Sequence, residues 1–150
     1  MRIGLISDTH GLLRPEALAF LAGADHIVHG GDIGGPDILD RLRALAPLTV
    51  VRGNNDSADW ARALPDTALL QVDGVAVYVV HDLKTLPRDP AAAGARVVVS
   101  GHSHKPVQRE DSGVLYVNPG SAGPRRFSLP ISVGELLVAG GTVQARIVML

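Results

Sequence analysis

Two histidines one residue apart, His102 and His104, are the part of this sequence with the clearest potential for chemistry. Alternate side chains of an extended segment point to the same side, so the two imidazoles would be neighbours if the preceding strand continues through them. The chain has no cysteine, and any metal site must therefore use histidine, carboxylate or amide side chains. The pair predicts a metal site if further ligands lie nearby.

Further side chains of the ligand type follow the apolar runs that read as strands. Asp8 and His10 follow the first run, Asp32 and Asn54 the next two, and His81 a later one. Loops at the carboxyl ends of strands meet where the strands share a sheet edge. With the histidine pair, that place would hold two carboxylates, one amide and four imidazoles. Each match alone is common, but their order and spacing together point to a metal centre.

The elements that must position these side chains alternate between strand and helix in the first sixty residues. Strands are predicted over 3–7, 26–29 and 48–52, and helices over 15–22 and 36–45. Each helix has proline at its first position, and the apolar residues of the second recur on one face. This order favours parallel strands with helices on the faces of the sheet and functional residues at the carboxyl ends of the strands.

Hairpins dominate the second half of the chain. Three pairs of strands are predicted, each joined by a turn that contains glycine: 69–72 with 75–80, 107–111 with 114–117, and 132–138 with 143–148. Residues 118–130, rich in proline and glycine, read as a long loop. So many strands in 150 residues favour two sheets packed face to face with helices outside, in a single domain over residues 1–150.

The composition limits the partners of the protein. A net charge of −1 and 3% aromatic residues argue against a nucleic-acid binder. The first residues enter a strand without the apolar stretch of a signal peptide, and the longest apolar runs are too short to cross a membrane. We therefore expect a cytoplasmic protein without membrane contact. The hairpin over 143–148 leaves a homo-oligomer, a dimer or tetramer, open.

The motifs taken together resemble those of the calcineurin-like metallophosphoesterases, and within them the small single-domain bacterial and archaeal phosphodiesterases of the YfcE type. Five motifs occur in order over nearly the whole chain: D-x-H at 8–10, G-D at 31–32, G-N-x-D at 53–56, H at 81 and G-H-x-H at 101–104. The N-P-G-S segment of that group is present at 118–121. The resemblance implies an α/β fold, a four-layer α-β-β-α sandwich of two mixed β-sheets flanked by helices, with two metal ions at the carboxyl ends of the strands.

The resemblance also implies a ligand role for seven side chains. Two groups of three would each bind one ion, with a carboxylate that bridges the ions: Asp8, His10 and His104; Asn54, His81 and His102; and Asp32 between the two. Three of these residues, Asp32, Asn54 and His81, are also the expected catalytic residues. The neighbouring histidines 102 and 104 would thus serve different ions of one pair.

Such a centre suits the hydrolysis of a small phosphate ester. Two divalent cations about 3.5–4 Å apart can share a hydroxide that bridges them and hold the oxygens of an in-line displacement at phosphorus. Nitrogen and oxygen ligands suit Mn²⁺, Fe²⁺, Co²⁺, Ni²⁺ or Zn²⁺, and the resemblance points first to Mn²⁺. Asp56 and Asp82 are the nearest candidates to orient the second nitrogens of the imidazoles, and His29 is expected to pack or to support the ligands from behind.

Four further residues are candidates for substrate contacts. Many relatives have a histidine at the position of Asn55, and an amide cannot donate a catalytic proton, so we expect fast hydrolysis of aryl phosphodiesters and slow hydrolysis of alkyl ones. Arg125 and Arg126 can bind a phosphate oxygen or be solvated surface residues. Asn118 can contact substrate or only form a turn.

Other functions remain open from the sequence. A phosphodiesterase is favoured over a phosphomonoesterase by the resemblance alone. A metal-binding scaffold without catalysis on the same fold is the alternative from another class, and the intact set of ligand residues argues against it. The nearly neutral charge and the few aromatic residues disfavour a nuclease.

Overall fold

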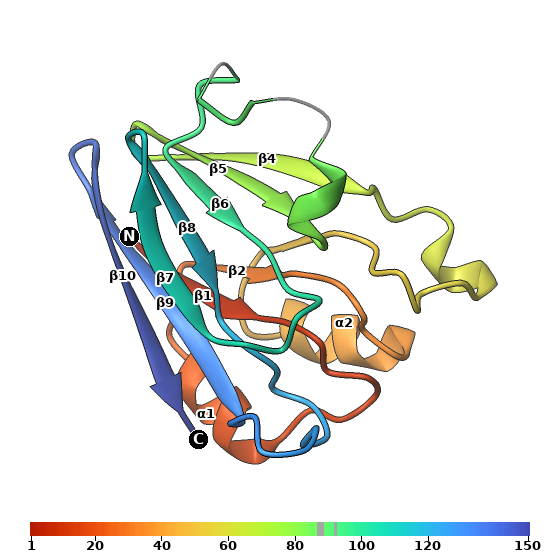
Figure 1. Cartoon of the computed structure of the whole chain (residues 1–150). Helices are drawn as coiled ribbons and strands as arrows, with labels where there is room; N and C mark the ends of the chain where they lie inside the picture. The colour runs from red at the N-terminus through yellow and green to blue at the C-terminus, as the bar shows by residue number, and fades with distance from the viewer. Residues whose placement is uncertain (87–88, 92) are drawn as a thin grey trace.

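Two five-stranded β-sheets make up most of the protein in the computed structural model, which describes residues 1–86, 89–91 and 93–150 (Figure 1). The first sheet contains five strands: β1 (Arg2–Ile6), β2 (His26–His29), β3 (Leu48–Val50), β9 (Ser132–Ala139) and β10 (Thr142–Met149). The second contains the other five: β4 (Thr67–Val72), β5 (Val75–Val80), β6 (Val97–Val99), β7 (Val107–Asp111) and β8 (Val114–Asn118). Their orders are β10-β9-β1-β2-β3 and β4-β5-β6-β8-β7.

The first part of the chain forms the predicted parallel unit. β1, β2 and β3 pair in parallel, and helices α1 (Pro15–Leu21) and α2 (Pro36–Arg43) connect them. Both helices begin at proline, whose fixed φ suits the first helical position. The buried residues of α2 are Ile38, Leu39 and Leu42, which lie on one face. The carboxyl ends of the three strands consequently lie at the same edge of the sheet.

The three predicted hairpins are all present. β4 pairs with β5, β7 with β8, and β9 with β10, each antiparallel. β6 lies between β5 and β8 and is parallel to both, while β9 is antiparallel to β1. Both sheets are therefore mixed, and the end of β6 points the same way as the end of β5.

Apolar side chains fill the space between the layers. Valines of the second sheet, such as Val77 and Val97, pack against Leu5 and Val28 of the first. α1 and α2 cover the outer face of the first sheet, where Ile38 joins the core. Burying one such side chain contributes roughly 1.5–3 kcal/mol. The predicted α/β sandwich of two mixed sheets with outer helices is confirmed.

The outer cover of the second sheet is thin. Among the described residues it consists of the 3₁₀ helix η2 (Leu83–Thr85) and the chain near Ala95, which pack on Tyr78 and Val98. A second 3₁₀ helix, η1 (Asp59–Ala61), lies between β3 and β4. Within the described part of the chain, no helix is both long enough and apolar enough to cross a membrane.

Candidate metal centre

Left-handed backbone positions most of the predicted ligands. Five of the seven have φ between 46° and 72°: Asp8, His10, Asp32, His102 and His104. This conformation costs residues other than glycine about 1–2 kcal/mol each, and strained residues of this kind cluster at functional sites. The chain turns sharply where the strands end, and its side chains converge on one place.

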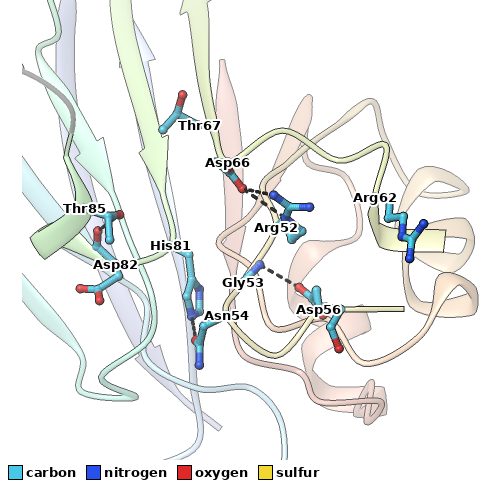
Figure 2. A pocket seen from close by; sticks show the side chains of 11 residues that line it. Arg52, Gly53, Asn54, Asp56, Arg62, Asp66, Thr67, His81, Asp82 and Thr85 are labelled. Carbon is cyan, nitrogen blue, oxygen red and sulfur yellow. Dashed lines mark hydrogen bonds and ion pairs between the residues drawn. The ribbon is translucent and has the colours of Figure 1, made fainter. Parts of the chain in front are cut away.

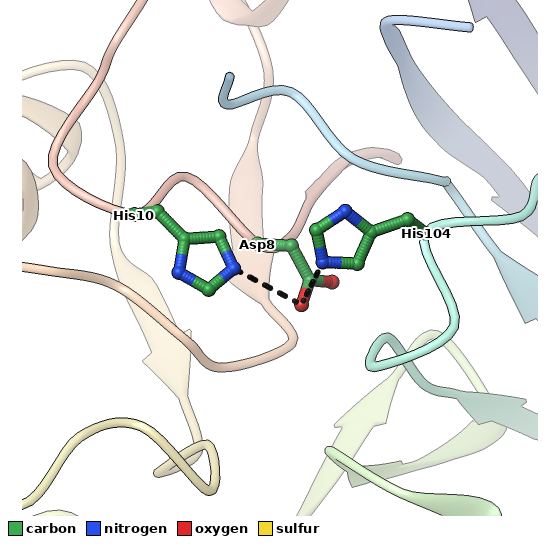
Figure 3. A group of neighbouring side chains, drawn as sticks. All are labelled: Asp8, His10 and His104. Atoms are coloured by element: carbon green, nitrogen blue, oxygen red, sulfur yellow. Dashed lines mark ion pairs between the residues drawn. The ribbon is translucent and has the colours of Figure 1, made fainter. Parts of the chain in front are cut away.

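The first predicted ligand group is assembled as expected (Figure 3). The Oδ1 atom of Asp8 lies 3.4 Å from Nε2 of His104 and 4.0 Å from Nε2 of His10. Oδ1 of Asp8 and Nε2 of His10 are buried and form no hydrogen bond with the described residues. Buried polar atoms normally have a partner, and a carboxylate oxygen that faces two imidazole nitrogens suits a divalent cation.

The second group also comes together. Oδ1 of Asn54 lies 2.9 Å from Nε2 of His81 and 3.1 Å from Nδ1 of His102. The rings of His81 and His102 have centroids 5.2 Å apart, and those of His10 and His104 are 5.4 Å apart. The four imidazoles thus form two pairs, and each pair corresponds to one predicted ligand group.

Asp32 lies between the two groups. Its Oδ2 is 3.3 Å from Nε2 of His81 and 3.8 Å from Nε2 of His10. Burial raises the pKa of Asp32, but the hydrogen bonds of His81 and of the Asn55 N–H, with the charges of His81 and His10, lower the pKa to about 2. Asp32 is therefore ionised at neutral pH and fits the position of a bridging ligand.

The contact with Asp32 raises the pKa of His81. Burial lowers its pKa, but the carboxylate of Asp32 and the carbonyl of Gly30 outweigh burial and raise the pKa above its usual value. Nδ1 of His81 lies 2.7 Å from that carbonyl oxygen, which leaves Nε2 to face Asp32 and Asn54. A cation at this place must compete with a proton on His81, so its affinity is expected to fall as the pH falls.

The loop from 101 to 104 differs from the expected extended segment. β6 ends at Val99, and both His102 and His104 have left-handed backbone. The two imidazoles diverge, His102 toward His81 and His104 toward His10. The condition for side-by-side histidines, a strand that continues through them, is not met, although both histidines reach the same place. The left-handed turns, rather than the alternation of a strand, direct each one to its own group.

Asp56 has a different role from the one expected. Its carboxylate accepts hydrogen bonds from the backbone N–H groups of Asp32, Ile33 and Gly53, each at 2.9 Å, and it orients no imidazole among the described residues. It joins the loop after β2 to the loop after β3. Asp82 does face an imidazole, with its Oδ2 3.7 Å from Nε2 of His102.

Two buried contacts lie behind the predicted ligands. His29 lies between Oγ1 of Thr9, at 3.0 Å, and the N–H of Gly31, which donates to its Nδ1 at 3.0 Å. His29 is fully buried, as expected for a packed histidine. Ser7, which the sequence did not single out, donates to Oδ2 of Asp8 at 2.7 Å. Its position next to Asp8 at the end of β1 was the available signal.

The predicted substrate residues lie in different surroundings. Asn55 donates from its backbone N–H and its side-chain amide to the two oxygens of Asp32, at 2.9 and 3.2 Å. Asn118 is buried and donates to the carbonyl of Gly101 and to Oγ of Ser103, and so supports the loop from 101 to 104. The side chains of the exposed arginines 125 and 126 form no hydrogen bond or ion pair with the described residues.

A family model decides the relationship of the chain to known proteins. The calcineurin-like phosphoesterase superfamily domain matches residues 1–140. The chain belongs to this superfamily. A probable metallophosphoesterase of Methanothermobacter thermautotrophicus is 36% identical over 161 residues, which cover 99% of this chain and 92% of the relative. The phosphodiesterase YfcE of Escherichia coli is 30% identical over 160 residues, with 91% of this chain and 87% of that protein covered.

Solved structures show the same calcineurin-like fold. The phosphoesterase YfcE of E. coli superimposes with a TM-score of 0.71 at 24% identity and covers 99% of both chains. Wild-type Vps29 of Entamoeba histolytica complexed with Zn²⁺ superimposes with a TM-score of 0.79 at 21% identity, also over 99% of both chains. At these identities the similarity concerns the fold.

Proposed function

We propose that this calcineurin-like protein is a metal-dependent phosphodiesterase with a dinuclear metal centre. The observation that supports the proposal most strongly is the position of Asp32, whose Oδ2 lies within 3.8 Å of one imidazole from each ligand group. A carboxylate between two sets of neutral nitrogen ligands is the arrangement that holds two cations close together. The relatives named phosphodiesterase lead in the same direction.

The ligands are proposed to divide as the histidine pairs do. Asp8, His10 and His104 would hold one cation, the second group of three would hold the other, and Asp32 would contact both. When bound, two divalent cations supply a water of lowered pKa and positive charge for in-line displacement at phosphorus. Mn²⁺ is the proposed metal, and the nitrogen and oxygen ligands also suit Ni²⁺, Fe²⁺, Co²⁺ or Zn²⁺.

The remaining residues are proposed to orient and to attract the substrate. Only two of the seven ligands are carboxylates, so bound cations leave the centre positive and attract an anionic phosphoryl group. Asn55 holds Asp32 in place and offers no proton to a leaving group. Arg125 and Arg126 lie on the exposed loop that follows Gly123 and are proposed to bind a phosphate oxygen.

Hydrolysis of aryl phosphates tests the proposal. The protein loaded with Mn²⁺ should hydrolyse bis(4-nitrophenyl) phosphate faster than 4-nitrophenyl phosphate, and EDTA should stop the reaction. Supporting contacts of metal ligands cost 10–100-fold when removed, so Asp32→Asn is expected to lower kcat/KM by more than about 100-fold. Asp40→Asn, an exposed carboxylate on α2, is the matched control and should retain full activity.

The outcomes separate the candidate functions. A higher kcat/KM for the monoester would identify a phosphomonoesterase. A protein that binds Mn²⁺ but hydrolyses neither ester would support a metal-binding scaffold without catalysis. Vps29 has the same fold. The single domain over residues 1–150, the cytoplasmic location and the homo-oligomeric state stay predictions from the sequence.

A further inference from the structure

A cavity of about 860 Å³ opens beside the second ligand group (Figure 2). Asn54 and His81 form its inner wall, so it is continuous with the candidate metal centre. Loop residues after β3, the start of β4 and η2 contribute the outer wall, which includes Arg52, Ser57, Arg62, Asp66, Thr67 and Thr85. Ligand pockets in proteins are of this size, typically 300–1,000 Å³.

The side chains that line this cavity end in polar groups, although their carbon stems make up much of its surface. Among the described residues that line it, none has an apolar side chain, and His81 provides the one aromatic ring. Nucleobases bind proteins largely by stacking on aromatic side chains. The lining therefore disfavours an ester arm that carries a base.

The arginines of the outer wall are already paired with carboxylates. Arg52 donates from Nε and Nη2 to Oδ1 of Asp66, at 3.1 and 2.7 Å. Arg62 lies 3.3 Å from Asp59. A second phosphate would need cations that are not neutralised by a neighbouring carboxylate. The outer wall consequently favours an uncharged arm.

Hydroxyl groups match the hydrogen-bonding capacity that remains. A guanidinium has five N–H donors, and the pair with Asp66 uses two of those on Arg52. Oδ2 of Asp66 can accept, and the hydroxyls of Ser57 and Thr67 can both donate and accept. Donors and acceptors that alternate along a wall can bind a polyol, whose hydroxyl groups have both functions.

From this geometry we infer that the cavity binds an uncharged polyhydroxylated arm, glycerol or a sugar, of a phosphate ester whose phosphoryl group lies at the metal centre. The inference rests on the proposed function, because the metal centre must hold the phosphoryl group. It assigns substrate selection to Arg52, Ser57, Asp66 and Thr67, none of which belongs to the ligand groups.

Binding measurements separate the arm from the phosphate. We would titrate the protein loaded with Mn²⁺ with inorganic phosphate, propyl phosphate and glycerol 3-phosphate by isothermal titration calorimetry. Propyl phosphate and glycerol 3-phosphate share a three-carbon arm and differ in two hydroxyl groups. We expect glycerol 3-phosphate to bind about tenfold more tightly than propyl phosphate, because two well-placed hydrogen bonds contribute about that much binding free energy.

Two variants test where the arm lies. Thr67→Val and Ser57→Ala each remove one hydroxyl from the wall. Each variant should bind glycerol 3-phosphate about threefold more weakly, with its affinity for propyl phosphate unchanged. Thr142→Val removes an exposed hydroxyl at the start of β10 and should change neither affinity.

Each remaining outcome overturns the inference. Equal affinities for glycerol 3-phosphate and propyl phosphate would refute it, and binding of inorganic phosphate would show that the proposed function survives. A preference for glycerol 3-phosphate that neither variant reduces would place the arm elsewhere and refute it too. If inorganic phosphate does not bind, the proposed function fails first and the inference fails with it.

Discussion

Replacing Asp56 by alanine should destabilise the protein more than any other exchange of an aspartate outside the ligand groups. Its carboxylate accepts hydrogen bonds from four backbone N–H groups of two loops, and three of these groups are buried. An N–H group left without a partner in the interior costs about 1–3 kcal/mol. With three such groups and some relaxation, Asp56→Ala should lower the free energy of unfolding by about 3–5 kcal/mol.

Urea unfolding followed by circular dichroism, with EDTA present, measures this loss without a contribution from metal binding. Asp59→Ala is the control, since the Asp59 side chain is 92% exposed three residues away and should change stability by less than about 0.5 kcal/mol. A loss below about 1 kcal/mol for Asp56→Ala would contradict this role of the carboxylate, because one net hydrogen bond accounts for that amount. The loops after β2 and β3 would then be held together by other contacts.

Three further predictions concern the surroundings of the ligands. Burial lowers the pKa of His29 from 6.5 to about 4, so stability present above pH 6.5 should be lost as the pH falls toward 4. The part of this loss due to His29 at pH 5 is about 2 kcal/mol relative to pH 7.5, measured by urea unfolding in EDTA as the difference between the wild type and His29→Asn. Asp82→Asn should weaken Mn²⁺ binding about tenfold by calorimetry, because it releases His102; unchanged affinity would show that Asp82 does not orient that ring. For aryl phosphodiesters, kcat/KM should fall steeply as the pKa of the leaving group rises, because Asn55 cannot protonate it; a flat dependence would contradict this.

The fold was largely predictable because its signals are local. The turn Asp73-Gly74 has φ of 45° and 81°, and Ser112-Gly113 has φ of 52° and 81°, as a tight hairpin turn requires. Residues of these types accept positive φ, so the sequence identifies the turn and with it the antiparallel pairing. Proline at the start of α1 and α2 gives the beginning of each helix in the same way.

The candidate site was predictable only in part, because its geometry depends on contacts between distant loops. The motifs predict which residues converge. The directions of the His102 and His104 side chains depend on left-handed backbone, which histidine rarely adopts without support from the surrounding structure. The hydrogen bonds of Asp56 to the loop after β2 cross 23 or 24 residues of sequence. An aspartate in a turn-like sequence often binds backbone N–H groups, and that was the available signal.

The cavity beside Asn54 also lay beyond the sequence motifs. Arg52 and Asp66 meet only because β3 and β4 place the ends of a long connection side by side, and residues of these types are common on any surface. No local sequence pattern predicts that such a pair lines a cavity. The residues proposed to select the substrate can therefore be identified from the structure but not from the sequence.

Anomalous diffraction from a crystal grown with Mn²⁺ is the most direct test of the central claim that two cations lie in this centre. Two peaks about 3.5–4 Å apart are expected. One should lie against Asp8, His10 and His104, the other against Asn54, His81 and His102, with Asp32 in contact with both. A map without peaks there, or with Mn²⁺ bound only elsewhere on the protein, would contradict the dinuclear centre and the phosphodiesterase proposed from it.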